Sequence, residues 1–173
     1  RIGQTPNLKL NLAENESIEN IGAINLLNAM KISGRDKDGL GIGFLNAVTE
    51  KTIATVSNDD NDETRSIEIS PLTNYNVTVF DQRFNQNSSV TFINTNVTRN
   101  GSFRDANVTG LLFDLNNKSN KYNASGGIKS SEIYDVTNSN GVNATLNLAE
   151  TNGKFRYSVG GEYISKDFDN NDL

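Results

Sequence analysis

The chain has 173 residues and a net charge of −5, and it contains neither cysteine nor histidine. These absences exclude disulfides, cysteine nucleophiles, thiolate metal sites and every Ser-His-Asp arrangement. The acidic balance argues against nucleic acid as a partner, because nucleic acid requires a basic surface. The length fits one domain, and no apolar run is long enough for a transmembrane helix.

Alternating apolar and polar residues predict β-strands along almost the whole chain. After a short first strand we expect eight more, at about 21–34, 39–56, 66–82, 88–98, 106–116, 121–132, 141–150 and 153–165. The alternation is clearest in the last two. It is weaker at 88–98, where Val90 and Phe92 are followed on the same face by Asn94 and Asn96.

The stretch GLGIGFLNAV, residues 39–48, combines glycines with apolar residues and invites comparison with a nucleotide-binding loop. The dinucleotide fingerprint would need a third glycine where Phe44 stands, followed by a helix. The alternation continues instead, so we interpret the stretch as a strand. Leu40, Ile42 and Phe44 would then share one face.

The connections between the expected strands alternate between tight turns of Asn, Asp and Gly and longer polar loops. This asymmetry is typical of outer-membrane barrels, and strands of about ten residues suffice to cross a bilayer. We therefore expect an all-β fold, an antiparallel up-and-down transmembrane β-barrel to which residues 1–173 contribute about eight or nine strands. A soluble β-sandwich is the alternative, although its strands are usually about half as long.

In a barrel, alternate residues of each strand face lipid and lumen. Gly41, Gly43, Arg156 and Glu162 are the lumen candidates, although ordinary cross-strand pairing would also explain the charges. The expected lipid-facing residues are Leu40, Ile42, Phe44, Leu111, Phe113, Leu146, Leu148, Phe155, Tyr157 and Val159.

The sequence offers only weak candidates for a metal site or a catalytic site. The acidic run at 58–63 invites a calcium site, but it lacks the glycine and glutamate spacing of an EF-hand loop. A glycosidase needs two carboxylates, for which Glu132 with Asp135, or Asp105 with Asp114, could be proposed, but nothing distinguishes these pairs from the other acidic residues. We therefore expect no catalytic residue, no metal and no cofactor.

Three segments nevertheless have a familiar character: RIGQTPNLKLNL, AMKISGRDKDGLGIGFLNAVTE and PLTNYNVTVFDQRFNQNSSVTFINTNVTRNGSFRDANVTG. They resemble the barrel portion of large outer-membrane proteins of Gram-negative bacteria. Those proteins carry an N-terminal domain like carbohydrate-binding module family 9, ahead of a barrel domain of uncharacterised function. The resemblance extends from Arg1 to about Asp172. It implies that the chain is an interior slice of a longer protein, incomplete at both ends of the barrel, and it transfers no functional residue.

The main hypothesis is a segment of an outer-membrane barrel with a structural, transport or surface substrate-handling role. Its expected partners are outer-membrane lipid, other outer-membrane or periplasmic proteins, and carbohydrate. One alternative is a soluble β-sandwich adhesin or glycan-binding module. A second is a membrane-bound glycan hydrolase whose chemistry lies outside this segment.

Overall fold

A computed structural model describes residues 12–13, 15–18, 24–58, 63–85 and 87–170. Among these residues, no helix is long and apolar enough to span a membrane. The strands are β1 (Glu16–Ile18), β2 (Leu26–Arg35), β3 (Leu40–Thr49), β4 (Thr52–Asn58), β5 (Thr64–Ser70), β6 (Thr73–Phe84), β7 (Ser88–Arg99), β8 (Asp105–Asn116), β9 (Tyr122–Tyr134), β10 (Ser139–Glu150) and β11 (Tyr157–Ile164).

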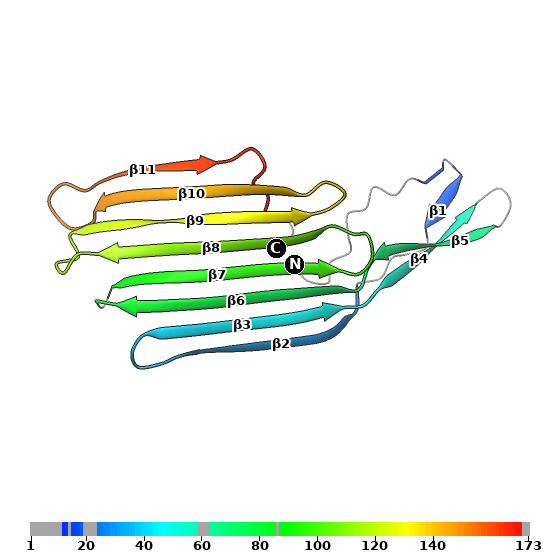
Figure 1. Ribbon diagram of the computed structural model, residues 1–173, viewed down its shortest axis with the longest axis horizontal. Coiled ribbons are helices and arrows are strands. Elements are labelled where there is room, and N and C mark those ends of the chain that lie inside the picture. Colours follow the sequence, from blue (N-terminus) through cyan, green and yellow to red (C-terminus); the bar gives the residue numbers. More distant parts are fainter. Residues whose placement is uncertain (1–11, 14, 19–23, 59–62, 86, 171–173) are drawn as a thin grey trace.

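The strands form two antiparallel sheets, which confirms the all-β expectation. The large sheet has eight strands in the order β11-β10-β9-β8-β7-β6-β3-β2, and the small sheet has the order β1-β4-β5. Figure 1 shows the large sheet as a broad, open layer, with the small sheet beyond the end of β3 and the start of β6. Within the part of the chain that the structure describes, β2 and β11 each have a strand neighbour on one side only.

Two of the predicted strands are wrong because each is divided between the sheets. The expected strand at 39–56 is broken at Glu50 and Lys51 into β3 and β4, and that at 66–82 is broken at Pro71 and Leu72 into β5 and β6. Pro71 has no N–H to donate to a ladder, so it suits this boundary. β3 therefore pairs with β6, and the β4–β5 hairpin leaves the meander to pair with β1.

The structure departs from the expected alternation of tight turns with longer loops. The predicted long loop around 57–66 lies in the small sheet, partly outside the described residues. In the large sheet, the connections at 100–104 and 135–138 are as short as those at 117–121 and 151–156. We call the end of the large sheet nearest the small sheet the junction end, and the opposite end the distal end.

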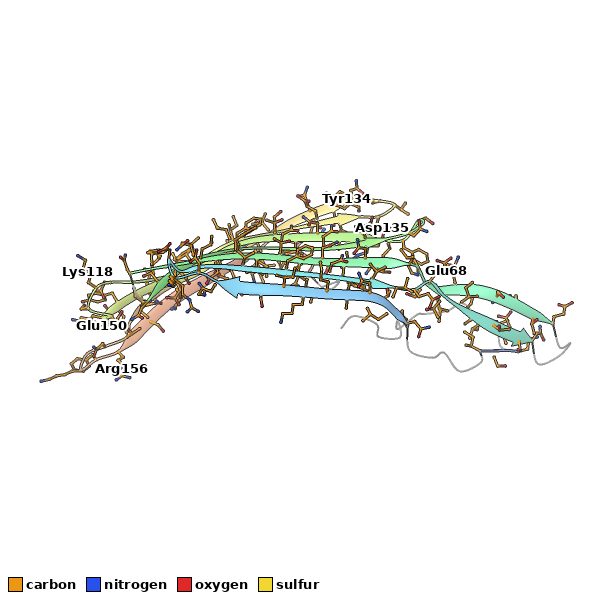
Figure 2. All side chains as sticks on the ribbon, turned by 90° about the horizontal axis from the view of Figure 1, so that it is seen from below. Glu68, Lys118, Tyr134, Asp135, Glu150 and Arg156 are labelled. Carbon is orange, nitrogen blue, oxygen red and sulfur yellow. The ribbon has the colours of Figure 1, made fainter. Side chains whose placement is uncertain are left out.

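Residues that are directly paired across antiparallel strands lie on the same face of the sheet. One continuous row runs through Phe80, Phe92, Leu111, Ile128 and Ala144. We call the face that carries this row the front face, and the other the back face. Figure 2 shows the sheet edge-on, with Tyr134 and Asp135 at the junction end and Lys118, Glu150 and Arg156 at the distal end.

A bidentate ion pair links β5 to β1 in the small sheet. Arg65 on β5 donates from Nε to Glu16 Oε1 at 2.9 Å and from Nη2 to Glu16 Oε2 at 2.8 Å. The backbone N–H of Ala13 also donates to Glu16 Oε2, at 3.0 Å. The hydrogen bonds from Arg65 and then from Ala13 lower the pKa of Glu16 from 4.5 to about 2.

We expect a carbon-detected titration of the Glu16 carboxyl to give a midpoint near pH 2, and Arg65→Gln to move it toward 4.5. Because the folded-state pKa is depressed, the stabilisation is present above about pH 4.5 and is lost as the pH falls toward 2. A midpoint that Arg65→Gln leaves unchanged would contradict this account of the small sheet.

Candidate functional site

The distal half of the front face carries a broad surface of exposed apolar side chains, which we call the apolar patch. Leu111 and Leu146, on β8 and β10, remain 49% and 50% exposed although their strands lie inside the sheet. A contiguous apolar surface of this kind normally contacts protein or lipid. The patch extends across all eight strands and consists of Ile32, Leu40, Ile42, Phe44, Phe80, Phe84, Val90, Phe92, Leu111, Phe113, Leu115, Tyr122, Ala124, Ile128, Ala144, Leu146, Leu148, Tyr157, Val159 and Tyr163.

Nine of the ten residues predicted to face lipid lie together in the apolar patch: Leu40, Ile42, Phe44, Leu111, Phe113, Leu146, Leu148, Tyr157 and Val159. The tenth, Phe155, lies in the turn before β11 and is 84% exposed. The structure thus brings nine of the predicted residues onto one surface.

The sequence interpretation did not count Phe80 and Phe92 among the lipid-facing residues, although their rings lie 6.4 Å apart between centroids on neighbouring strands. Their strands become polar toward the junction end, which weakens the alternation when it is judged over a whole strand. Examining each half-strand separately would have identified both residues.

The junction half of the front face is polar and rich in asparagine. Asn46 Nδ2 donates to Asn74 Oδ1 at 2.6 Å and to Asn76 Oδ1 at 2.8 Å. Asn94 Nδ2 donates to Asn107 Oδ1 at 2.9 Å, which links β7 to β8. We call this surface the asparagine patch; it consists of Asn46, Asn74, Asn76, Thr78, Asn94, Asn96, Thr98, Asn107, Thr109, Ser130 and Glu132.

The back face is polar where the front face is apolar. At the distal end, Arg35 of β2 forms an ion pair with Asp81 of β6, which also accepts a hydrogen bond from Thr91 Oγ1 at 2.7 Å. Arg83 Nε lies 3.8 Å from the same carboxylate. These contacts form an ionic cluster on this face.

Three of the four lumen candidates lie on the back face. Gly41 is covered by the Arg35 guanidinium, since a Cβ there would lie 2.7 Å from Arg35 Nη2. Gly43 faces Val79, and Glu162 accepts a hydrogen bond from Asn143 Nδ2 at 2.7 Å. The fourth, Arg156, lies in the turn before β11, at the distal end.

At the junction end much of the back face is buried, and apolar side chains lie at its centre. Ala47, Val97 and Ala106, on β3, β7 and β8, are at most 2% exposed, and Ile133 of β9 is 6% exposed. The two faces therefore exchange polarity halfway along the strands. The front face is apolar at the distal end and polar at the junction end. The back face is polar at the distal end and buried at the junction end, where it combines apolar residues with the buried polar residues Thr49, Thr73, Ser131 and Asn143.

The proposed acid pairs find no support in the arrangement of the strands. Asp105 and Asp114 lie near opposite ends of β8 and on opposite faces. Glu132 accepts a hydrogen bond from Tyr134 Oη at 3.0 Å, whereas Asp135 accepts one from the N–H of Val136 in the turn after β9. No cluster of three or more metal-ligating residues occurs among the described residues, and positions 59–62 of the acidic run lie outside them.

Comparison with known proteins assigns the sequence to a family of unknown function. No curated protein and no solved structure matches the chain. Residues 1–173 match the family described as a domain of unknown function, DUF5916. Because this match covers the whole sequence, the chain belongs to the DUF5916 family.

Proposed function

We propose that the eight-stranded sheet is part of the wall of a Gram-negative outer-membrane β-barrel, with the apolar patch toward lipid and the back face toward the interior. The exchange of polarity between the two faces carries this proposal. A barrel wall inside a bilayer needs an apolar outer face and tolerates a polar inner one, and this is the arrangement of the distal half.

The junction half suits a barrel wall that extends beyond the hydrocarbon core of the bilayer. Its outer surface would be the asparagine patch, whose amides can bond to water, and its inner surface would pack against protein. Among the described residues, the outer edges of β2 and β11 have no strand partner. This supports the same proposal, because exposed edges require further strands and a closed barrel supplies them.

The role proposed for such a wall is passage or handling of a polar substrate, with the ionic cluster of Arg35, Asp81 and Arg83 lining the interior. The resemblance of the sequence to barrels that follow carbohydrate-binding domains makes carbohydrate one candidate substrate. Other outer-membrane or periplasmic proteins are the proposed partners.

Labelling of introduced thiols tests the proposal, because the chain has no cysteine of its own. Ile128 and Tyr134 lie on the same strand and face, and their exposed fractions, 53% and 49%, are nearly equal. In membranes containing the full protein, we expect a membrane-impermeant maleimide to label Tyr134→Cys but to leave Ile128→Cys unlabelled. Both should react equally after unfolding in detergent.

Equal labelling of the two folded variants would overturn the membrane proposal. A parent protein that is folded and monomeric in water without detergent would overturn it as well, because lipid would then not be needed to cover the apolar patch.

A soluble β-sandwich is the second candidate, and the height of the apolar patch favours it. At about 3.3 Å per residue, Leu111 to Leu115 spans only about 13 Å, and Tyr157 to Tyr163 about 20 Å. Outer-membrane barrels usually carry a band of about 25 Å. A second sheet packed on the patch would need no such height, and solubility without detergent is the result that would favour it.

A further inference from the structure

The chain turns inward after β11, over the back face. Ser165 extends the pairing with β10: its N–H donates to the Val142 carbonyl at 2.9 Å, and its Oγ accepts from the Val142 N–H at 2.8 Å. The Phe168 N–H then donates to the Ser165 carbonyl at 3.2 Å, which closes a turn. Residues 165–170 consequently cross strands that precede β11 in the sheet, and we call them the inward segment.

Three strands contribute to holding the inward segment. On β10, Gly141 leaves space for it, because a Cβ there would lie 2.2 Å from the Phe168 nitrogen. On β9, Ser131 Oγ accepts a hydrogen bond from the Asp169 N–H at 3.0 Å, and Ser131 is 0% exposed. Next to β8, Arg104 Nη2 lies 2.7 Å from Asp169 Oδ2.

All these contacts are on the back face. Gly141 and Ser131 are paired across β10 and β9, and Ser131 is paired in turn with Val108 of β8, which lies on the same face as the buried Ala106. The back face is the interior surface in the proposed barrel. The inward segment would therefore occupy interior space at the junction end.

We propose that residues 165–170 narrow the interior of the barrel at its junction end, held by Gly141, Ser131 and the Arg104–Asp169 ion pair. This inference rests on the proposed function. It identifies a constriction that opens when the segment is released, so that the passage of small polar solutes is regulated by the chain itself.

Conductance of the full protein in planar lipid bilayers tests the constriction. Asp169→Ala removes the carboxylate that Arg104 holds, and we expect it to raise single-channel conductance about twofold or more, because pore width limits conduction. Asp167→Ala is the matched control. It removes the same charge from the same segment but none of the contacts described above, so its conductance should equal that of the parent.

A double variant, Ser131→Cys with Asp169→Cys, keeps the proposal testable if single changes disturb folding. We expect the two thiols to form a disulfide under mild oxidation, and the oxidised protein to have the conductance of the parent. Reduction of the disulfide should then raise the conductance to the level expected for Asp169→Ala. The proposed constriction is overturned if the protein inserts into lipid but its thiols form no disulfide. It is also overturned if reduction leaves the conductance unchanged. A parent protein that does not insert into lipid overturns the proposed function instead.

Discussion

Leu146→Arg is expected to prevent stable insertion of the protein into lipid. Leu146 lies within the apolar patch, between Gly126 of β9 and Gly161 of β11. A charged side chain at mid-membrane on the lipid-facing surface of a barrel costs about 2–4 kcal/mol. The measurement is the free energy of unfolding of the full protein, from urea titration in phospholipid vesicles.

Asn140→Arg provides the control, because Asn140 lies on the same strand and face as Leu146 but at the polar junction end. Glu132 is its direct neighbour on β9, so a positive charge there has an acidic partner. We expect this variant to insert as the parent does. Equal losses in the two variants would show that charge is excluded from the whole face, and not from a membrane-spanning band.

Gly126→Ala is expected to lower the free energy of unfolding by about 1–3 kcal/mol, the usual cost of forcing atoms into a packed site. A Cβ at Gly126 would lie 2.2 Å from the Thr145 carbonyl oxygen and 3.1 Å from the Leu146 Cα. Both are backbone atoms of β10, so the strands themselves would have to separate. Thermal or urea unfolding of the variant beside the parent measures the loss.

Gly161→Ala separates this clash from a general effect of adding a methyl group. Gly161 is the neighbour of Leu146 on the other side, and nothing lies within 4 Å of its expected Cβ. Replacing a glycine where the conformation allows it stabilises by about 0.4–1 kcal/mol, through the unfolded chain. If the two variants lost stability equally, the close approach of β9 and β10 would not be the cause.

Much of the large sheet could be predicted from the sequence. The strands at 88–98, 106–116 and 141–150 were expected within one or two residues of β7, β8 and β10, because period-two alternation is a local property of a strand with two unlike faces. The same alternation placed Leu111, Phe113, Leu146 and Leu148 on one side of their strands. The grouping of these residues with Leu40 and Ile42 then followed from pairing neighbouring strands.

The division into two sheets could not be predicted in this way. The polar run from Thr49 to Thr52 interrupts the alternation, but the pattern on either side of it is the same whether β4 extends β3 or leaves for another sheet. Only the pairing shows that Thr49 lies opposite Thr73 in the large sheet, while Thr52 lies opposite Ser70 in the small one. The partner of a strand depends on residues distant in sequence, and periodicity carries no information about them.

The sequence by itself determined the class of fold and the apolar side of each strand, because both depend on the spacing of side chains along an extended backbone. The tertiary structure decided which strands are neighbours, that the apolar patch and the asparagine patch share one face, and that residues 165–170 cross the other. These features arise from the register between strands and from close contacts such as Gly141 with Phe168. Such contacts join segments that only the folded chain brings together.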